Sequence, residues 1–361
     1  MDDPMARLRR HAERLVDAGA CLAFGVARIA PGGAEDAFLH GRAAPGGPAG
    51  ALDPHLRLRA ASITKGALGR LAAVLAAKGA LDLGAPHPLP PGPPVTLGGL
   101  LSHTDGLRDA AGYLPEDGES PRDLAPRARA APGGFFYSNL GALLAAQIVE
   151  EAAGERIDRL LAERVLAPAG IGGGLNWSGV ADRARRLPLW QRRGARLTLE
   201  ADGDDWPWGA DAIAGGAPVD LRAYCPGRDT ARLSPHAGLR ASLLELVRLA
   251  LAWGADDAAG RLQRAVRWRA PAPDAPEAAG GLFPAMCLSL TPFRDHPAVP
   301  GDLLGHAGHA LGFSGGAWFD RRTGGAFAYA LTGVADATEG SDTEAFFAPE
   351  EMVVFEALAA R

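Results

Sequence analysis

Two short apolar runs near the N-terminus predict the first strands of a sheet. Residues 21–29 and 36–43 are joined by a Pro-Gly-Gly turn, and this combination is typical of a β-hairpin. A third extended segment follows at 55–61. The segment that begins at Ser62 has helical composition. It ends with Lys78 and Gly79, which suit the last turn and the left-handed cap of a helix. Ser62 is therefore expected at a helix N-terminus.

The middle of the chain has the pattern of helices followed by an irregular stretch. Residues 97–107 predict a short helix, and 139–165 predict two helices broken at Gly154. Residues 172–234 show no sustained period and contain several glycine-rich turns, so they are expected to form an irregular insertion near the site. Helices are predicted again at 241–254 and 257–269.

The C-terminal part returns to strands. Its last two apolar runs flank the segment Asp320–Gly324, which predicts a hairpin turn. Ser341 with Glu344 three residues later has the capping-box pattern and predicts a final helix. The predicted strands are 283–290, 302–307, 314–319 and 325–332.

Strands at both ends with helices between them indicate an α/β fold of the α+β kind. Such a pattern is buried most simply by one antiparallel sheet built from both termini and flanked by helices, with a mainly helical lobe inserted after the third strand. We expect 1–61 and 235–361 to form a discontinuous α/β lobe and 62–234 to form the helical lobe, including the insertion at 172–234.

Composition and charge narrow the class of protein. The chain has 361 residues, enough for two lobes around a large core, and a net charge of −5, which provides no basic field for nucleic acid. The N-terminal residues lack the apolar segment of a secretory signal, and no uncharged apolar stretch reaches membrane-spanning length, so we expect a cytoplasmic protein that binds a small molecule. The three cysteines are odd in number and lack metal-ligand spacing, so neither a disulfide framework nor a zinc site is expected.

Ser62 and Lys65 have the spacing of a nucleophile and its base. Residues three apart on a helix share a face, with Cβ atoms about 5–6 Å apart. A serine hydroxyl becomes a strong nucleophile when a neighbour removes its proton, and a lysine can do this when desolvation or positive charge lowers its pKa. Lys65 and Lys78 are the only lysines in an arginine-rich chain, and Lys78 already has a role at the helix end.

Two further segments carry candidate site residues. Tyr137-Ser138-Asn139 precedes a predicted helix, so Ser138 or Asn139 is a candidate N-cap. A Tyr-x-Asn pattern is nevertheless rare in a chain with four tyrosines, and its occurrence after the serine–lysine pair favours a role in the site. The segment Gly305–His309 falls on a predicted strand, where a backbone N–H could face a developing oxyanion.

The three motifs Ser62-Ile63-Thr64-Lys65, Tyr137-Ser138-Asn139 and His306-Ala307-Gly308 occur in the order found in the serine β-lactamase-like, penicillin-binding-protein-like superfamily. The chain resembles the class C enzymes and their esterase relatives in particular. The stretch Leu101–Leu107 is similar to the family's LLSHTSGL segment, and 234–242 resembles its Gly-Gly-Leu segment. The likeness covers nearly the whole chain.

This resemblance implies an acyl-enzyme on Ser62, with Lys65 and Tyr137 sharing the proton transfers and either of them serving as general base. It also implies that Asn139 holds Lys65 or the substrate amide. By the same likeness, His306 and Gly308 belong to the substrate-binding strand, the N–H groups of Ser62 and His309 form the oxyanion hole, and no cofactor takes part.

One departure from the family pattern bears on the substrate. The usual third motif is Lys-Thr-Gly, whose cation and hydroxyl help to hold a substrate carboxylate, whereas His306 and Ala307 stand here. Efficient β-lactam hydrolysis is therefore not expected, and an ester, an amide or a D-amino-acid peptide is the favoured substrate. The alternatives are an acyltransferase of the same fold, or a protein that is acylated without turnover and acts as a sensor.

Other residues are weaker candidates. His103 lies in a segment that is a structural turn in the family, so it is left out of the site. Four aromatic residues are possible walls of an acyl pocket, although core positions suit them equally well. These are Trp206, Trp208, Tyr224 and Phe313.

Overall fold

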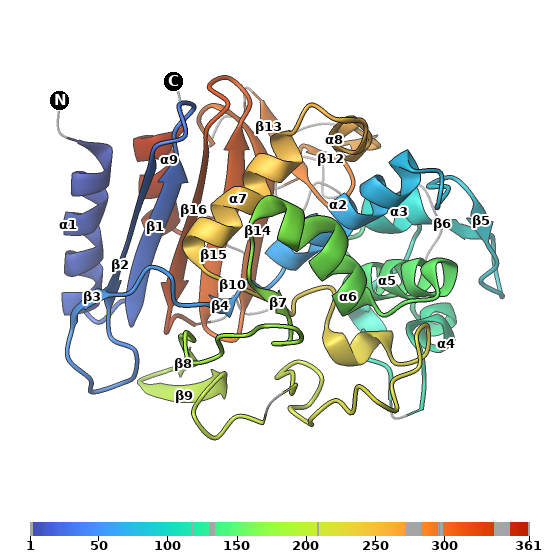
Figure 1. Cartoon of the computed structure of the whole chain (residues 1–361), viewed down its shortest axis with the longest axis horizontal. Helices are drawn as coiled ribbons and strands as arrows, with labels where there is room; N and C mark the ends of the chain where they lie inside the picture. Colours follow the sequence, from blue (N-terminus) through green and yellow to red (C-terminus); the bar gives the residue numbers. More distant parts are fainter. Residues whose placement is uncertain are drawn as a thin grey trace.

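The computed structural model describes residues 3–116, 118–129, 134–207, 209–271, 283–294, 296, 299–335 and 347–359. One large sheet carries helices on both faces, and a mostly helical region lies beside it (Figure 1). None of the described helices is both long enough and apolar enough to cross a membrane.

The large sheet joins the two ends of the chain. Its seven strands are antiparallel and lie in the order β13-β14-β15-β16-β1-β2-β3. The ends meet where β1 pairs with β16, with Ala23 opposite Thr332 and Ile29 opposite Ala326. The antiparallel sheet built from both termini is thereby confirmed. The strands are β1 (Ala23–Ile29), β2 (Glu35–Gly41), β3 (Gly50–Leu52), β13 (Thr291–Arg294), β14 (Asp302–Ala310), β15 (Phe313–Asp320) and β16 (Ala326–Thr332).

Helices cover both faces of this sheet because its strands alternate two sets of apolar side chains. Phe24 and Val26 of β1 pack in one cluster with α1 (Pro4–Asp17) and α9 (Pro349–Leu358). Ala23 and Ala27 point the other way, into the cluster that includes α7 (Leu243–Gly254). The sheet therefore has no solvent-facing side at its centre.

The helical region is built around α2 (Ile63–Ala77), which is buried along most of its length. It begins after Ser62, as predicted, and Gly79 follows it with φ +71°. The predicted break at Gly154 is also present, because that residue ends α5 in the left-handed conformation. The other helices are α3 (Leu97–Leu101), η1 (Asp109–Ala111), α4 (Pro121–Leu124), η2 (Ala125–Ala128), α5 (Asn139–Ala153), α6 (Ile157–Leu161), η3 (Ala162–Leu166), η4 (Ala167–Ala169), η5 (Thr230–Leu233) and α8 (Ala258–Arg264).

The extended segment before Ser62 is not the third strand of the large sheet, so that prediction was wrong. The third strand is β3, which pairs back onto β2. Residues Leu58–Arg59 instead form β4, and this short strand pairs with β10 (Leu239–Ala241) in a separate sheet completed by β7 (Gly174–Leu175). The segment that leads to Ser62 is thus tied to residues far away in the sequence.

Four further predictions need correction or lie outside the described residues. The insertion contains a hairpin of β8 (Leu189–Arg193) and β9 (Arg196–Ala201), which the alternating leucines and the turn at Gly194 could have indicated. The helix predicted to reach residue 269 ends with α8, and the run at 283–290 contributes only a two-residue strand. Ser341 and Glu344 are not described, and the final helix is α9. The remaining strands are β5 (Pro86–His87), β6 (Val95–Thr96), β11 (Trp268–Arg269) and β12 (Ala285–Met286).

Candidate active site

Ser62 lies at the N-terminus of α2, directly after a constrained turn. Ala61 has φ +46°, a left-handed conformation that non-glycine residues rarely adopt. Hydrogen bonds hold this turn on both sides: the Ala60 N–H donates to the Leu239 carbonyl over 2.8 Å, and the Thr64 hydroxyl donates to the Ala61 carbonyl over 2.6 Å. The serine is therefore presented by a fixed backbone.

Lys65 lies one turn further along α2, and its ammonium group contacts three oxygen atoms. Its Nζ is 2.9 Å from Ser62 Oγ, 2.7 Å from Asn139 Oδ1 and 3.1 Å from the His236 carbonyl oxygen. Burial lowers the pKa of Lys65 to about 7, while the negative charge of Asp109 acts in the opposite direction. A lysine with this pKa can take up the Ser62 proton near neutral pH.

Tyr137 and Asn139 come from the N-terminus of α5. The Tyr137 ring centroid lies 5.0 Å from Lys65 Nζ. Burial raises the pKa of the Tyr137 hydroxyl well above its usual value, although its hydrogen bond with Ser62 opposes this shift. The phenol is therefore protonated in the resting site, and Asn139 supplies the side-chain oxygen that holds Lys65.

Asp109 anchors this motif, and the sequence analysis missed it. Its carboxylate accepts hydrogen bonds from the Ser138 hydroxyl over 2.9 Å, the Asn139 N–H over 2.8 Å and the Leu140 N–H over 3.2 Å. A carboxylate at a helix N-terminus is favoured by the unpaired N–H groups and the helix dipole. No spacing in the sequence connects Asp109 to a helix that begins thirty residues later.

The strand β14 brings the third motif to the serine. Gly308 must lack a side chain, since a Cβ there would lie 3.1 Å from the Ser62 nitrogen and 2.7 Å from the Ala60 carbonyl oxygen. His306 lies on the same face of the strand, with its ring centroid 6.1 Å from that of Tyr137. Burial, reinforced by the charge of Lys65, lowers the pKa of His306 to about 3, so this imidazole is neutral.

His309 differs from the other predicted residues, because its side chain lies on the opposite face of β14. Its Nε2 is 3.5 Å from Oε1 of Glu351, a buried residue of α9. Only the backbone of His309 can therefore serve the serine. The other predicted residues, Ser62, Lys65, Tyr137, Asn139, His306 and Gly308, come together around the α2 N-terminus.

Two rings flank that of Tyr137. Phe283 stacks on the Tyr137 ring at 5.4 Å, and the His103 ring lies 4.5 Å from it. His103 also accepts the Ser138 N–H at Nδ1 over 3.2 Å, which gives it a role in the turn. Of the weaker candidates, Tyr224 donates to the buried Glu150 and Phe313 is a core residue. Trp206 is half-buried and lines a pocket with Trp177 and Asp202, and Trp208 is not described.

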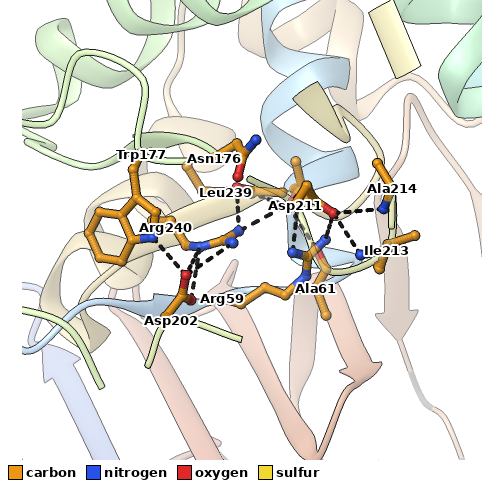
Figure 2. A network of polar contacts seen from close by, with 12 residues as sticks. Arg59, Ala61, Asn176, Trp177, Asp202, Asp211, Ile213, Ala214, Leu239 and Arg240 are labelled. Carbon is orange, nitrogen blue, oxygen red and sulfur yellow. Dashed lines mark hydrogen bonds and ion pairs between the residues drawn. The ribbon is translucent and has the colours of Figure 1, made fainter. Parts of the chain in front are cut away.

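Behind the site lies a fully buried network of four charged side chains (Figure 2). Arg59 on β4 binds Asp211 in the insertion through two hydrogen bonds of 2.9 and 3.0 Å. Arg240 on β10 lies 3.0 Å from Asp202, which also accepts the indole N–H of Trp177. The network fixes the insertion to two short strands. One of them, β4, precedes Ser62, and the other, β10, follows His236, whose carbonyl oxygen contacts Lys65. Within the described ranges, no group of three His, Cys, Asp or Glu side chains could hold a metal ion.

Comparison with known proteins identifies the family. Residues 9–346 match the model of the Beta-lactamase family. The chain belongs to the Beta-lactamase family. No curated protein matches this Beta-lactamase-family chain in sequence.

Solved structures share the fold of this Beta-lactamase-family protein at low sequence identity. D-amino acid amidase from Ochrobactrum anthropi SV3, complexed with L-phenylalanine amide, is 18% identical with a TM-score of 0.66, covering 97% of this chain and 96% of that chain. The octameric penicillin-binding protein homologue from Pyrococcus abyssi is 17% identical with a TM-score of 0.70, covering 99% and 76%. D-stereospecific amidohydrolase from Streptomyces sp. is 17% identical with a TM-score of 0.62, covering 91% and 94%.

Proposed function

We propose that the protein is a serine hydrolase that forms an acyl-enzyme on Ser62 and acts on small amides or esters, including amides and peptides of D-amino acids. The observation that carries this proposal is the distance of 2.9 Å between Lys65 Nζ and Ser62 Oγ. Together with the lysine pKa of about 7, this distance pairs a nucleophile with a base that is competent near neutral pH.

The proposed first step moves one proton and exchanges one bond. The Ser62 hydroxyl proton passes to the free amine of Lys65 while Ser62 Oγ attacks the carbonyl carbon. The bond to the leaving nitrogen or oxygen then breaks, and the leaving group takes the proton, either from Lys65 directly or through the Tyr137 hydroxyl. Water subsequently cleaves the acyl-enzyme. The raised pKa of Tyr137 favours Lys65 as the base in the resting site.

The neutral character of the third motif supports a substrate that lacks the carboxylate of a penicillin. His306 is buried and its pKa is about 3, so it presents no cation to a substrate carboxylate. Penicillins carry such a carboxylate, whereas simple amides and esters do not. Two proteins of the same fold, named as a D-amino acid amidase and a D-stereospecific amidohydrolase, make the amides of D-amino acids the first substrates to test. The acyltransferase and sensor alternatives, and a cytoplasmic location, stay predictions from the sequence.

Intact-mass spectrometry tests the proposal directly. The wild type and Ser62→Ala are exposed briefly to a p-nitrophenyl acyl ester, D-alanine amide and a penicillin, and product release is followed in parallel. We expect an adduct on the wild type alone that clears as product accumulates. A persistent adduct would favour a sensor or a transferase without its acceptor, and no adduct with any reagent would contradict the proposal.

A further inference from the structure

We propose that Asp109 is a positioning residue of this active site: its carboxylate fixes the segment 138–140 against Lys65 and supplies the negative charge that balances the lysine. The inference rests on the proposed function for its catalytic meaning. It assigns a role to a side chain outside the three sequence motifs.

The contacts of Asp109 reach Lys65 through a single residue. Both carboxylate oxygens are engaged: Oδ2 accepts the Asn139 N–H over 2.8 Å, and Oδ1 accepts the Ser138 hydroxyl over 2.9 Å and the Leu140 N–H over 3.2 Å. Asn139 in turn places its side-chain oxygen 2.7 Å from Lys65 Nζ. The carboxylate therefore fixes the backbone of the residue that binds the lysine.

The helix N-terminus has a second cap that does not involve Asp109. The Ser138 hydroxyl accepts the Gly141 N–H over 2.9 Å, which is the usual N-cap bond. Asp109 is only half-buried, so its replacement leaves no uncompensated charge in a dry core. A variant at this position is therefore expected to keep the fold.

The charges around Lys65 give Asp109 its second role. Three histidines are close enough to Lys65 to feel its charge: burial, and after it this charge, hold the pKa of His306, His103 and His236 below the usual value, so all three are neutral near pH 7. The Tyr137 phenol is neutral as well, because burial raises its pKa. Against this neutral surrounding, the Asp109 charge raises the pKa of Lys65 and partly offsets desolvation.

Removing the charge should therefore shift the proton affinity of Lys65 in a known direction. Without Asp109, desolvation acts unopposed, and the lysine loses its proton at a lower pH. A residue that only capped the helix would change stability but would leave this midpoint where it is.

The scarcity of lysine makes the measurement direct. Lys65 and Lys78 are the only lysines, so protein labelled with ¹³Cε-lysine gives two NMR signals, which Lys65→Arg assigns. The titration of the Lys65 signal is compared in the wild type, Asp109→Asn and Asp109→Glu, with Lys78 as internal reference. Asp123→Asn is the matched control, because Asp123 also lies at a helix N-terminus and accepts a serine N–H and hydroxyl, each over 2.8 Å.

We expect the Lys65 midpoint to fall by about half a pH unit or more in Asp109→Asn and to stay near the wild-type value in Asp109→Glu and Asp123→Asn. The acylation rate of Asp109→Asn should also fall, because Asn139 loses its anchor. A wild-type midpoint in Asp109→Asn would overturn the proposal. If the wild type is never acylated, the proposed function fails, yet the titration still decides the role of Asp109.

Discussion

Arg59 and Asp211 form a two-point ion pair in which both side chains are fully buried, and Arg59 lies three residues before Ser62. Burial alone would raise the pKa of Asp211, but the charges of Arg59 and Arg240 outweigh burial and hold this pKa well below its usual value. The same carboxylate accepts the N–H groups of Ile213 and Ala214. The irregular insertion is therefore anchored to the Ser62 segment by charge rather than by apolar packing alone.

Asp211→Asn is expected to destabilise the protein strongly. It leaves two buried arginines with one carboxylate, and breaking a buried pair from one side typically costs about 3–5 kcal/mol. Urea unfolding measures the free energy of unfolding. Asp204→Asn is the control, because Asp204 is fully exposed and its surface pair with Arg186 is expected to contribute little to stability. Equal stability of the two variants would contradict the prediction.

Lys65→Arg should abolish most of the acylation of Ser62 even though it keeps the positive charge. Arginine cannot release its proton in the physiological range, so the base is lost, and rates are expected to fall about 10²- to 10⁴-fold. Burst-phase release of p-nitrophenol measures the acylation rate. Lys78→Arg replaces the other lysine, outside the site, and should acylate like the wild type. Normal turnover by Lys65→Arg would rule out the proposed base.

The acylation rate should rise with pH through neutrality. Lysine acts as a base only when deprotonated, and the pKa of Lys65 is about 7, so the active fraction grows from pH 6 to pH 8. Stopped-flow measurements use an ester that does not ionise in this range, so the pH dependence of the rate reports the ionisation of the enzyme group alone. A rate that decreases over the same interval would instead indicate that Lys65 must be protonated and would favour Tyr137 as base.

Gly308→Ala is expected to reduce acylation about 10²-fold, similar to the loss of one oxyanion donor. The added methyl group would lie 2.7 Å from the Ala60 carbonyl oxygen and 3.1 Å from the Ser62 nitrogen, so β14 must move away from the serine. Gly50→Ala on β3 is the control, because a Cβ there meets nothing within 4 Å. Burst-phase acylation compares the two, and a rate for Gly308→Ala equal to that of the control would show that the close approach has no catalytic role.

The sequence predicted features whose signals are local. The hairpin of β1 and β2, the helix after Ser62 and the serine–lysine pair each depend on residues a few positions apart, and the structure places them as expected. The β8–β9 hairpin also had a local signal, which was overlooked.

Other features depend on pairing over long distances and left no local pattern. Arg59 and Asp211 are 152 residues apart, and Lys65 and the His236 carbonyl are 171 apart. Nothing in the neighbourhood of Asp109 indicates that it anchors Asn139. The face of β14 on which the His309 side chain lies could have been inferred from alternation, because His309 is three positions after His306, which is an odd offset.

The pairing of β1 with β16 has a consequence for the timing of synthesis. Ser62 is made early, but the strand that carries Gly308 is held between β15 and β13, and the sheet reaches the N-terminal strands only through β16. A growing chain therefore carries Ser62 for most of its synthesis without the strand that brings Gly308 beside it. Reactivity of Ser62 should emerge only when the last strand has left the ribosome, which keeps unfinished chains from being acylated before they fold.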